Sequence, residues 1–201
     1  MGIDQMIFRW VNHWPSEWEP FFWFFSEGNK QWAVRGLFLA LAIYLIWNKT
    51  TRVATVRGLV AFPVTNALTD AIKFGFPMDR PCAVVARALD GGMARDLAMK
   101  LDPELILRVP HTASSGTASA HAANTMAVAV SLLYAKSPWG WLWLGVSFFT
   151  GTSRIYNGVH YPSQVLLGWI CGAFVAWVVS TTHAHWVKVR TSRPVAASSD
   201  Q

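Results

Sequence analysis

Three short stretches of the chain combine cationic, hydroxyl and histidine side chains. They are KFGFPMDRP at residues 73–81, SSGTASAH at residues 114–121 and SRIYNGVHYPSQ at residues 153–164. A planar guanidinium, such as that of Arg80 or Arg154, suits two-point contact with a phosphate group, and Lys73 adds a compact positive charge. The stretches therefore indicate a site for a phosphorylated molecule.

Histidine supplies the reactive groups of these stretches. An imidazole can attack phosphorus to give a phosphohistidine, or protonate a departing oxygen near neutral pH. His121 and His160 each lie within a few residues of a phosphate-type cation or a predicted helix start. A lone histidine near a membrane interface is more often structural, so it is the pair that points to catalysis. The remaining histidines lack such neighbours: His13, His111, His183 and His185.

Ser119 stands at the start of an apolar segment that is predicted to be helical. The free N–H groups in the first turn of a helix bind anions, and a serine hydroxyl adds a further donor. Serine is also a common helix N-cap. Both interpretations of Ser119, phosphate ligand and helix cap, remain open at this point.

Five apolar segments must hold the three stretches in place, and they cover roughly residues 33–48, 54–72, 119–135, 139–152 and 162–181. The chain has 201 residues, of which 53% are apolar, and its mean hydropathy is +0.28. Several runs of near-bilayer length, together with 12 Trp residues, favour a membrane protein over a very apolar soluble helical protein. The predicted fold is all-α, a polytopic transmembrane helix bundle of five to six spans.

The basic residues predict how this bundle is oriented. They lie in short loops between apolar segments and in the tail, which is typical of cytoplasmic loops: Lys49, Arg52, Arg57, Lys136, Lys188 and Arg190. Alternation of the segments then brings all three stretches to the outer face of a bacterial inner (plasma) membrane, with a cytoplasmic C-terminus. The net charge of +6 does not come from a basic run with interleaved aromatics, so we expect no nucleic-acid partner.

The remaining segments complete the predicted organisation. Residues 1–32 are rich in Trp and Phe but interrupted by prolines and polar residues. They predict an amphipathic helix in the headgroup region, with a strained first span as the alternative. Residues 82–117 form a long loop that we interpret as a cap over the site. Residues 33–182 would be the membrane domain, and residues 183–201 a basic cytoplasmic tail that ends in a disordered stretch.

The three stretches resemble the signatures of the type 2 phosphatidic acid phosphatases, the PAP2 superfamily. Those signatures read Lys-x6-Arg-Pro, Pro-Ser-Gly-His and Ser-Arg-x5-His-x3-Asp. Residues 73–81 match the first in full, and residues 118–121 match the second with alanine in place of Pro and Gly. Residues 153–164 match the third except that Gln164 stands at its final position. The resemblance covers roughly residues 33–181.

The resemblance implies a role for each residue. His160 would be the nucleophile that takes the phosphoryl group, and His121 would protonate the departing oxygen. Four residues would hold the phosphate oxygens: Lys73, Arg80, Ser119 and Arg154. The family uses neither metal nor cofactor, and its substrates are lipid phosphates and diphosphates reached from the bilayer. Among these we favour undecaprenyl diphosphate over phosphatidylglycerol phosphate. Nothing in the sequence indicates an oligomeric state.

Gln164 is the main departure from the family pattern. The family's aspartate accepts a hydrogen bond from the nucleophilic histidine and stabilises its positive charge, whereas a glutamine offers a carbonyl oxygen without charge. In serine proteases the comparable Asp→Asn change lowers turnover about 10⁴-fold. We therefore expect slow turnover with phosphate binding retained. The alternatives are an inactive lipid-phosphate binder and a phosphotransferase that passes the phosphoryl group to a lipid acceptor.

Overall fold

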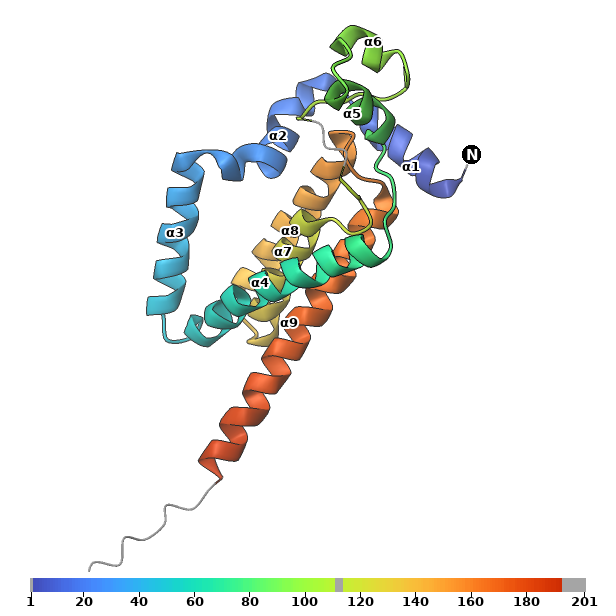
Figure 1. Ribbon diagram of the computed structural model, residues 1–201. Helices are drawn as coiled ribbons and strands as arrows, with labels where there is room; N and C mark the ends of the chain where they lie inside the picture. The colour runs from blue at the N-terminus through green and yellow to red at the C-terminus, as the bar shows by residue number, and fades with distance from the viewer. Residues whose placement is uncertain (1, 111–113, 193–201) are drawn as a thin grey trace, which may run out of the picture.

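The computed structural model describes residues 2–110 and 114–192, and every regular element in this part of the chain is a helix (Figure 1). The predicted all-α class is therefore confirmed. The helices, in order, are α1 (Ile3–Asn12), η1 (Ser16–Trp18), α2 (Glu19–Glu27), η2 (Gly28–Lys30), α3 (Trp32–Trp47), α4 (Arg52–Gly75), α5 (Ala83–Asp90), α6 (Arg95–Met99), α7 (Ala120–Tyr134), α8 (Trp139–Tyr156) and α9 (Pro162–Thr191).

Helix α7 lies at the centre of the bundle, where it packs against α4, α8 and α9. Its buried face consists largely of alanines: Ala122, Ala123, Ala127 and Ala129. Gly168 and Gly172 lie on the face of α9 that meets this helix, and a Cβ added at Gly172 would lie 2.0 Å from the carbonyl oxygen of Ala123. Small residues on both helices therefore allow their backbones to approach closely, as is common between membrane helices.

Each of the five apolar segments forms a helix, namely α3, α4, α7, α8 and α9, and the bounds agree with those expected except at the end of α9. In the described part of the chain, only α9 is both long enough and apolar enough to cross a membrane, and α3 is apolar but has 16 residues. Helix α7 has 15 residues and so rises about 22 Å, less than the ~30 Å of a bilayer's hydrocarbon core. The number of spans is thus not confirmed and remains a prediction.

The N-terminal segment folds onto the bundle. It divides into α1, with ten residues, and α2, with nine, so neither helix approaches the ~20 residues of a span. Both helices pack against α8, and α1 also contacts α9. Phe22 of α2 is buried with its ring centroid 4.6 Å from that of Tyr156. The placement of this segment in the headgroup region stays a prediction, but its inner face belongs to the protein core.

Helices α5 and α6 lie at the same end of the bundle as α1 and α2 (Figure 1). They belong to the loop between α4 and α7 that was predicted to cap the site, although residues 111–113, including His111, lie outside the described residues. At the opposite end, α9 continues to Thr191, ten residues beyond the predicted end at 181, and projects past the other helices (Figure 1). Residues 193–201 of the predicted tail are also outside the described part.

The contact between α7 and α9 leads to a stability prediction. We expect Gly172→Val to lower the thermal midpoint in detergent, because the new side chain would collide with the backbone of Ala123. Overpacking of this kind costs about 1–3 kcal/mol. Gly145→Val on α8 is the matched control, since no atom lies within 4 Å of a Cβ added there. Equal melting curves for the two variants would contradict the close approach of α7 and α9.

Candidate active site

The three sequence stretches meet at the end of the bundle where α4 ends and α7 and α9 begin. The loop after α4 is tied to the residues before α7, because the Met78 N–H donates to Thr117 Oγ1 at 3.0 Å and the Gly116 N–H donates to the Met78 carbonyl at 2.8 Å. The Ser119 N–H donates to the backbone carbonyl of Gln164 at 3.0 Å. Backbone contacts therefore join all three stretches before any side chain of the site is considered.

His160 lies in the turn between α8 and α9, and only 2% of it is exposed. Its Nε2 lies 2.9 Å from Arg80 Nη1, and its Nδ1 lies 3.1 Å from Gln164 Oε1. Since a guanidinium can only donate, Nε2 must be the accepting nitrogen and Nδ1 must carry the proton. In this tautomer the Nε2 lone pair accepts a hydrogen bond from Arg80.

Hydrogen bonds also set the orientation of the Gln164 amide. Its Oε1 accepts from the His160 ring and from the Tyr161 N–H at 3.2 Å, while its Nε2 donates to the Asp79 carbonyl at 2.8 Å. Exchanging the oxygen and nitrogen would place donor against donor at Tyr161 and acceptor against acceptor at Asp79. The carbonyl oxygen therefore faces Nδ1, and the hydrogen bond of the family's His–Asp pair is kept without its negative charge.

The surroundings of His160 favour its neutral form. Burial lowers the pKa of the imidazole well below 6.5, and the positive charges of Arg80 and Arg154 lower it further. A neutral imidazole is the form that can act as a nucleophile, because its Nε2 lone pair is free of a proton.

Arg80 is held in a cage of backbone carbonyls. Its Nε donates to the Ser114 carbonyl at 2.8 Å, and its Nη2 donates to the Ser115 carbonyl at 3.2 Å. Burial lowers the pKa of Arg80 to about 10, so the guanidinium stays charged at neutral pH. A Cβ added at Gly116 would lie 2.6 Å from Arg80 Cγ and 2.8 Å from Gln164 Oε1. This position therefore requires glycine so that Arg80 and Gln164 can approach each other.

Arg154 has partners that the sequence did not indicate. Its Nη1 donates to Glu27 Oε1 at 3.1 Å and to the Ser26 hydroxyl, both at the end of α2. Its Nε is buried and has no partner among the described residues. The signal in the sequence that could have indicated this contact was Glu27, an acid just after the aromatic run from Phe21 to Phe25. This signal is weak, because an acid is also common at a solvent-exposed helix end.

Two further predicted residues lie at the start of α7. Ser119 occupies the N-cap position but makes no side-chain capping bond, and its buried hydroxyl has no partner in the described part of the chain. The cap interpretation therefore does not account for the hydroxyl. His121 follows in the first turn of α7. The positive charges of Arg80 and Arg154 act on the rings of both His121 and His160.

Lys73 is the least integrated of the seven predicted residues. It lies in the last turn of α4, where its ammonium forms an ion pair with Asp70 at 3.0 Å. The structure shows no bond from Lys73 to the other six residues among those it describes. The side chain is 20% exposed and lies one turn from the loop that carries Arg80.

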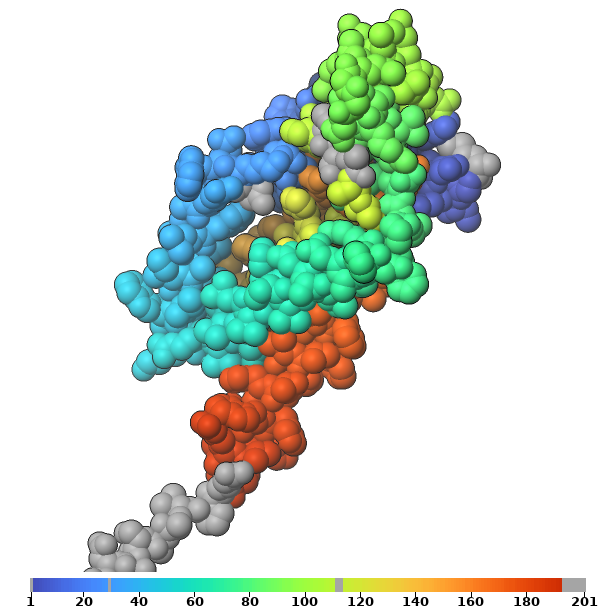
Figure 2. Space-filling model, in the orientation of Figure 1, coloured from blue at the N-terminus to red at the C-terminus, as the bar shows by residue number. Residues whose placement is uncertain are grey.

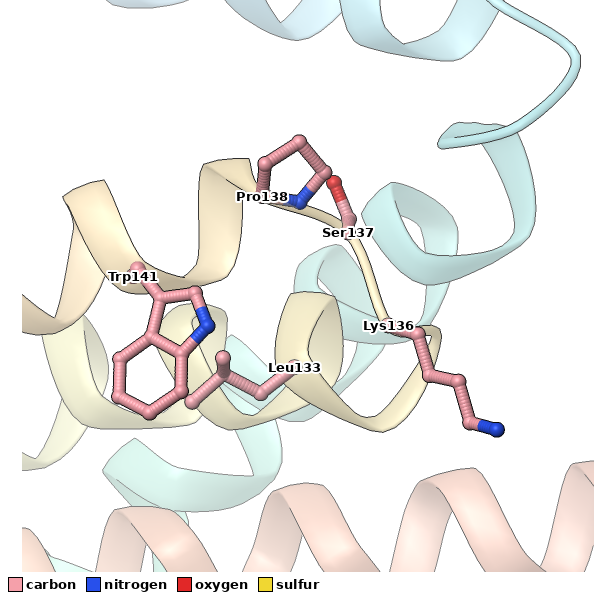
Figure 3. A pocket seen from close by; sticks show the side chains of 5 residues that line it. All are labelled: Leu133, Lys136, Ser137, Pro138 and Trp141. Carbon is pink, nitrogen blue, oxygen red and sulfur yellow. The ribbon is translucent and has the colours of Figure 1, made fainter.

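One face of the protein is hollowed. Figure 2 shows a recess between α3 and α4, with the residues that follow position 113 at its edge. Helix α3 buries only Leu45 against the rest of the protein, so most of its length stands away from the bundle. A separate pocket of about 540 Å³ lies at the far end of α7, lined by Leu133, Lys136, Ser137, Pro138 and Trp141 (Figure 3). That pocket has no part in the site, because His121 is at the opposite end of the helix.

Comparison with known protein families identifies the family of this chain. The PAP2 superfamily matches residues 54–188, which include α4, α7, α8 and most of α9. This chain belongs to the PAP2 superfamily. The resemblance of the three stretches is thereby confirmed at the level of the family, and the chain is a member of a group of lipid phosphatases.

Named relatives and a solved structure agree with this PAP2 assignment. The chain is 26% identical over 88% of its length to the "Bacitracin transport permease protein BcrC" of Bacillus licheniformis, of which it covers 80%. It is 25% identical over 68% of its length to an undecaprenyl-diphosphatase of Sulfolobus acidocaldarius, of which it covers 58%. The crystal structure of Aquifex aeolicus LpxE is similar in fold, with a TM-score of 0.66 and 21% identity over 90% of this chain and 96% of that one.

The geometry of the PAP2 site predicts the protonation of His160. In the substrate-free protein we expect a neutral ring at pH 6 with the proton on Nδ1, because its pKa lies well below 6.5. Histidine-selective ¹⁵N NMR would show this, with His160→Ala used to assign the signal. A His160 ring whose titration midpoint lies at or above pH 6.5 would contradict the neutral form described here.

The same pKa has a consequence for stability. The unfolded chain binds a proton at this histidine near pH 6.5, whereas the folded chain does so only at a much lower pH. The contribution of His160 to the free energy of unfolding is therefore complete above pH 6.5 and decreases below it, by at most about 1.4 kcal/mol per pH unit. Chemical denaturation in detergent at several pH values would measure this dependence of the free energy of unfolding on pH. The contribution of His160 to it should be absent in His160→Ala.

Proposed function

We propose that this protein is an integral membrane phosphatase that hydrolyses a lipid phosphate or diphosphate through a phosphohistidine at His160. The observation that carries the proposal is the buried imidazole of His160, whose Nδ1 is held by Gln164 at 3.1 Å and whose Nε2 lies 2.9 Å from Arg80 Nη1. A phosphate that binds Arg80 would replace Nε2 as the acceptor of this N–H, which frees the Nε2 lone pair to attack phosphorus.

The proposed reaction has two steps. When the anionic phosphate binds beside it, His121 takes up a proton from water. In the first step, His160 Nε2 attacks phosphorus, the bond from phosphorus to the leaving oxygen breaks, and His121 gives that oxygen this proton. In the second, His121 takes a proton from water, the water oxygen bonds to phosphorus, and the P–N bond breaks to release inorganic phosphate. Arg80, Arg154 and Ser119 would hold the other phosphate oxygens, and Lys73 would join them once it leaves Asp70.

The proposed substrate is an isoprenoid lipid diphosphate, undecaprenyl diphosphate. It is supported by a relative named as an undecaprenyl-diphosphatase and by a second, from Bacillus subtilis, that is 34% identical over 29% of this chain and of which this chain covers 30%. The recess between α3 and α4 in Figure 2 would let a lipid enter from the side. Apolar side chains exposed on the outside of the bundle suit contact with acyl chains, including Leu37, Leu39, Leu166, Ile170, Phe174 and Trp177.

The proposed location is the bacterial plasma membrane, with the site at the outer face. The basic loops that were assigned to the cytoplasm belong to one end of the bundle, where the turns between α3 and α4 and between α7 and α8 lie (Figure 1). Arg57 of α4 contacts His183 of α9 at the same end, at 3.0 Å. The site lies at the other end, so the positive-inside rule supports an outward-facing site.

Gln164 supports a second candidate, a lipid-phosphate binder with little turnover. The phosphorylated imidazole carries a positive charge, and a neutral amide stabilises it less than a carboxylate would. The retained hydrogen bond from Nδ1 to Gln164 favours slow catalysis over complete loss, because the ring is still held in the reactive tautomer.

Mutation of His160 tests catalysis. We expect His160→Ala to lower the rate of phosphate release from detergent-solubilised protein at least about 1000-fold, because no other group can take the place of His160. His185→Ala, on the exposed far end of α9, is the matched control and should match wild type. His160→Ala with wild-type activity would refute the mechanism.

Gln164→Asp tests the second candidate. We expect turnover to rise about tenfold or more, since a carboxylate would stabilise the charged imidazole. The gain should be smaller than the full effect in serine proteases, because aspartate cannot donate to the Asp79 carbonyl as Gln164 does. Gln31→Asp, on the exposed turn before α3, is the control. Tight lipid binding with no turnover in either protein would favour the binder.

Independence from metal is a separate prediction. We expect phosphate release to proceed without added metal and to be unchanged by a chelator, because arginine, lysine and histidine side chains would supply the positive charge. Activity that disappears after EDTA treatment and returns with Mg²⁺ would contradict this prediction.

A further inference from the structure

A buried carboxylate from the N-terminal segment reaches into the site. Glu27, the last residue of α2, places Oε1 3.1 Å from Arg154 Nη1, and both side chains are less than one-tenth exposed. Its second oxygen pairs with Lys30 of η2. Replacing such a buried pair by well-packed apolar residues is often neutral or stabilising, so the pair contributes little net stability. The pair therefore needs an explanation beyond stability alone.

Glu27 engages one side of the Arg154 guanidinium and leaves another free. Nη1 donates to both Glu27 and the Ser26 hydroxyl, so α2 holds this nitrogen at two points. Nε is buried and has no partner among the described residues. A guanidinium binds an oxyanion through two neighbouring N–H groups, and the edge that carries Nε is left for that contact. The carboxylate thus orients Arg154 without occupying the edge that a phosphate would need.

The charge balance of this cluster fits the same role. Burial alone would raise the pKa of Glu27, but Lys30 and Arg154 lower it below its usual value, so the carboxylate is ionised. A lone carboxylate would repel a phosphate, yet with Lys30 and Arg154 beside it the group of three keeps one net positive charge. In the described part of the chain no hydrogen bond joins Glu27 to His160, so Glu27 does not take the place of Gln164 beside Nδ1.

We propose that Glu27 is a positioning residue for Arg154 and that the N-terminal segment is therefore part of the phosphate site. The inference rests on the proposed function, because it assigns Arg154 to a phosphate group. Ser26 assists by accepting a hydrogen bond from the same nitrogen. Without Glu27, Arg154 would keep its place in α8 but lose its fixed orientation, and a phosphate would have to order it on binding.

The test is a double-mutant cycle read by binding as well as by turnover. Glu27→Gln should weaken binding of inorganic pyrophosphate, measured by thermal shift of the full chain in detergent, by about tenfold to a hundredfold, and lower kcat/KM equally. In an Arg154→Ala background, Glu27→Gln should cause no further loss, because the residue through which it acts is gone. Glu17→Gln, exposed on η1 of the same segment, is the matched control and should match wild type.

The outcomes separate this inference from the proposed function. If His160→Ala abolishes turnover and Glu27→Gln binds pyrophosphate like wild type, the inference is wrong and the proposed function stands. Equal fold-losses from Glu27→Gln with and without Arg154 would also overturn it, since they would show an effect on the fold alone. A wild-type protein that neither binds pyrophosphate nor releases phosphate would overturn the proposed function itself. Should Glu27→Gln unfold, Glu27→Asp, which keeps the charge but shortens its reach, takes its place in the same cycle and should give an intermediate loss.

Discussion

The site depends on the need of one buried amide to satisfy all of its polar atoms. Gln164 is 1% exposed, and its side chain accepts from His160 and Tyr161 while donating to Asp79. Its backbone carbonyl accepts from the N–H of Ser119. An amide left unpaired in the interior costs about 1–3 kcal/mol for each unsatisfied group, so these bonds are strongly favoured as a set. Through this single residue the loop after α4, the start of α7 and the start of α9 acquire one common geometry.

Gln164 also helps to begin helix α9. Gln164 is the third residue of that helix, and its side chain receives the backbone N–H of Tyr161 at the N-cap position. The bond that begins the helix and the bond that fixes the imidazole thus share one oxygen.

The fold and much of the site could be predicted from the sequence, because their signals are local. Apolar runs indicated the five long helices, and the spacing of Arg80, Arg154 and His160 matched a known family. The contacts of the N-terminal segment could not be predicted, because a pairing such as Asn12 with the carbonyl of Tyr156, at 2.8 Å, joins positions 144 residues apart. The end of α9 was also missed, because the helix continues beyond position 181 and its residues from 185 to 192 are exposed. The number of spans stayed open because α4 and α8 alternate apolar with small and polar residues.

The separation in sequence between α2 and α8 has a consequence for biogenesis. Glu27 and Arg154 lie 127 residues apart, so Glu27 has only its neighbours Ser26 and Lys30 as partners until α8 has been synthesised. At ribosomal rates of about 5–20 residues per second, this interval lasts on the order of ten seconds. Throughout it, the acid of this aromatic-rich segment has Lys30 but not Arg154 beside it. The N-terminal segment can therefore reach its final position only after most of the chain has been made.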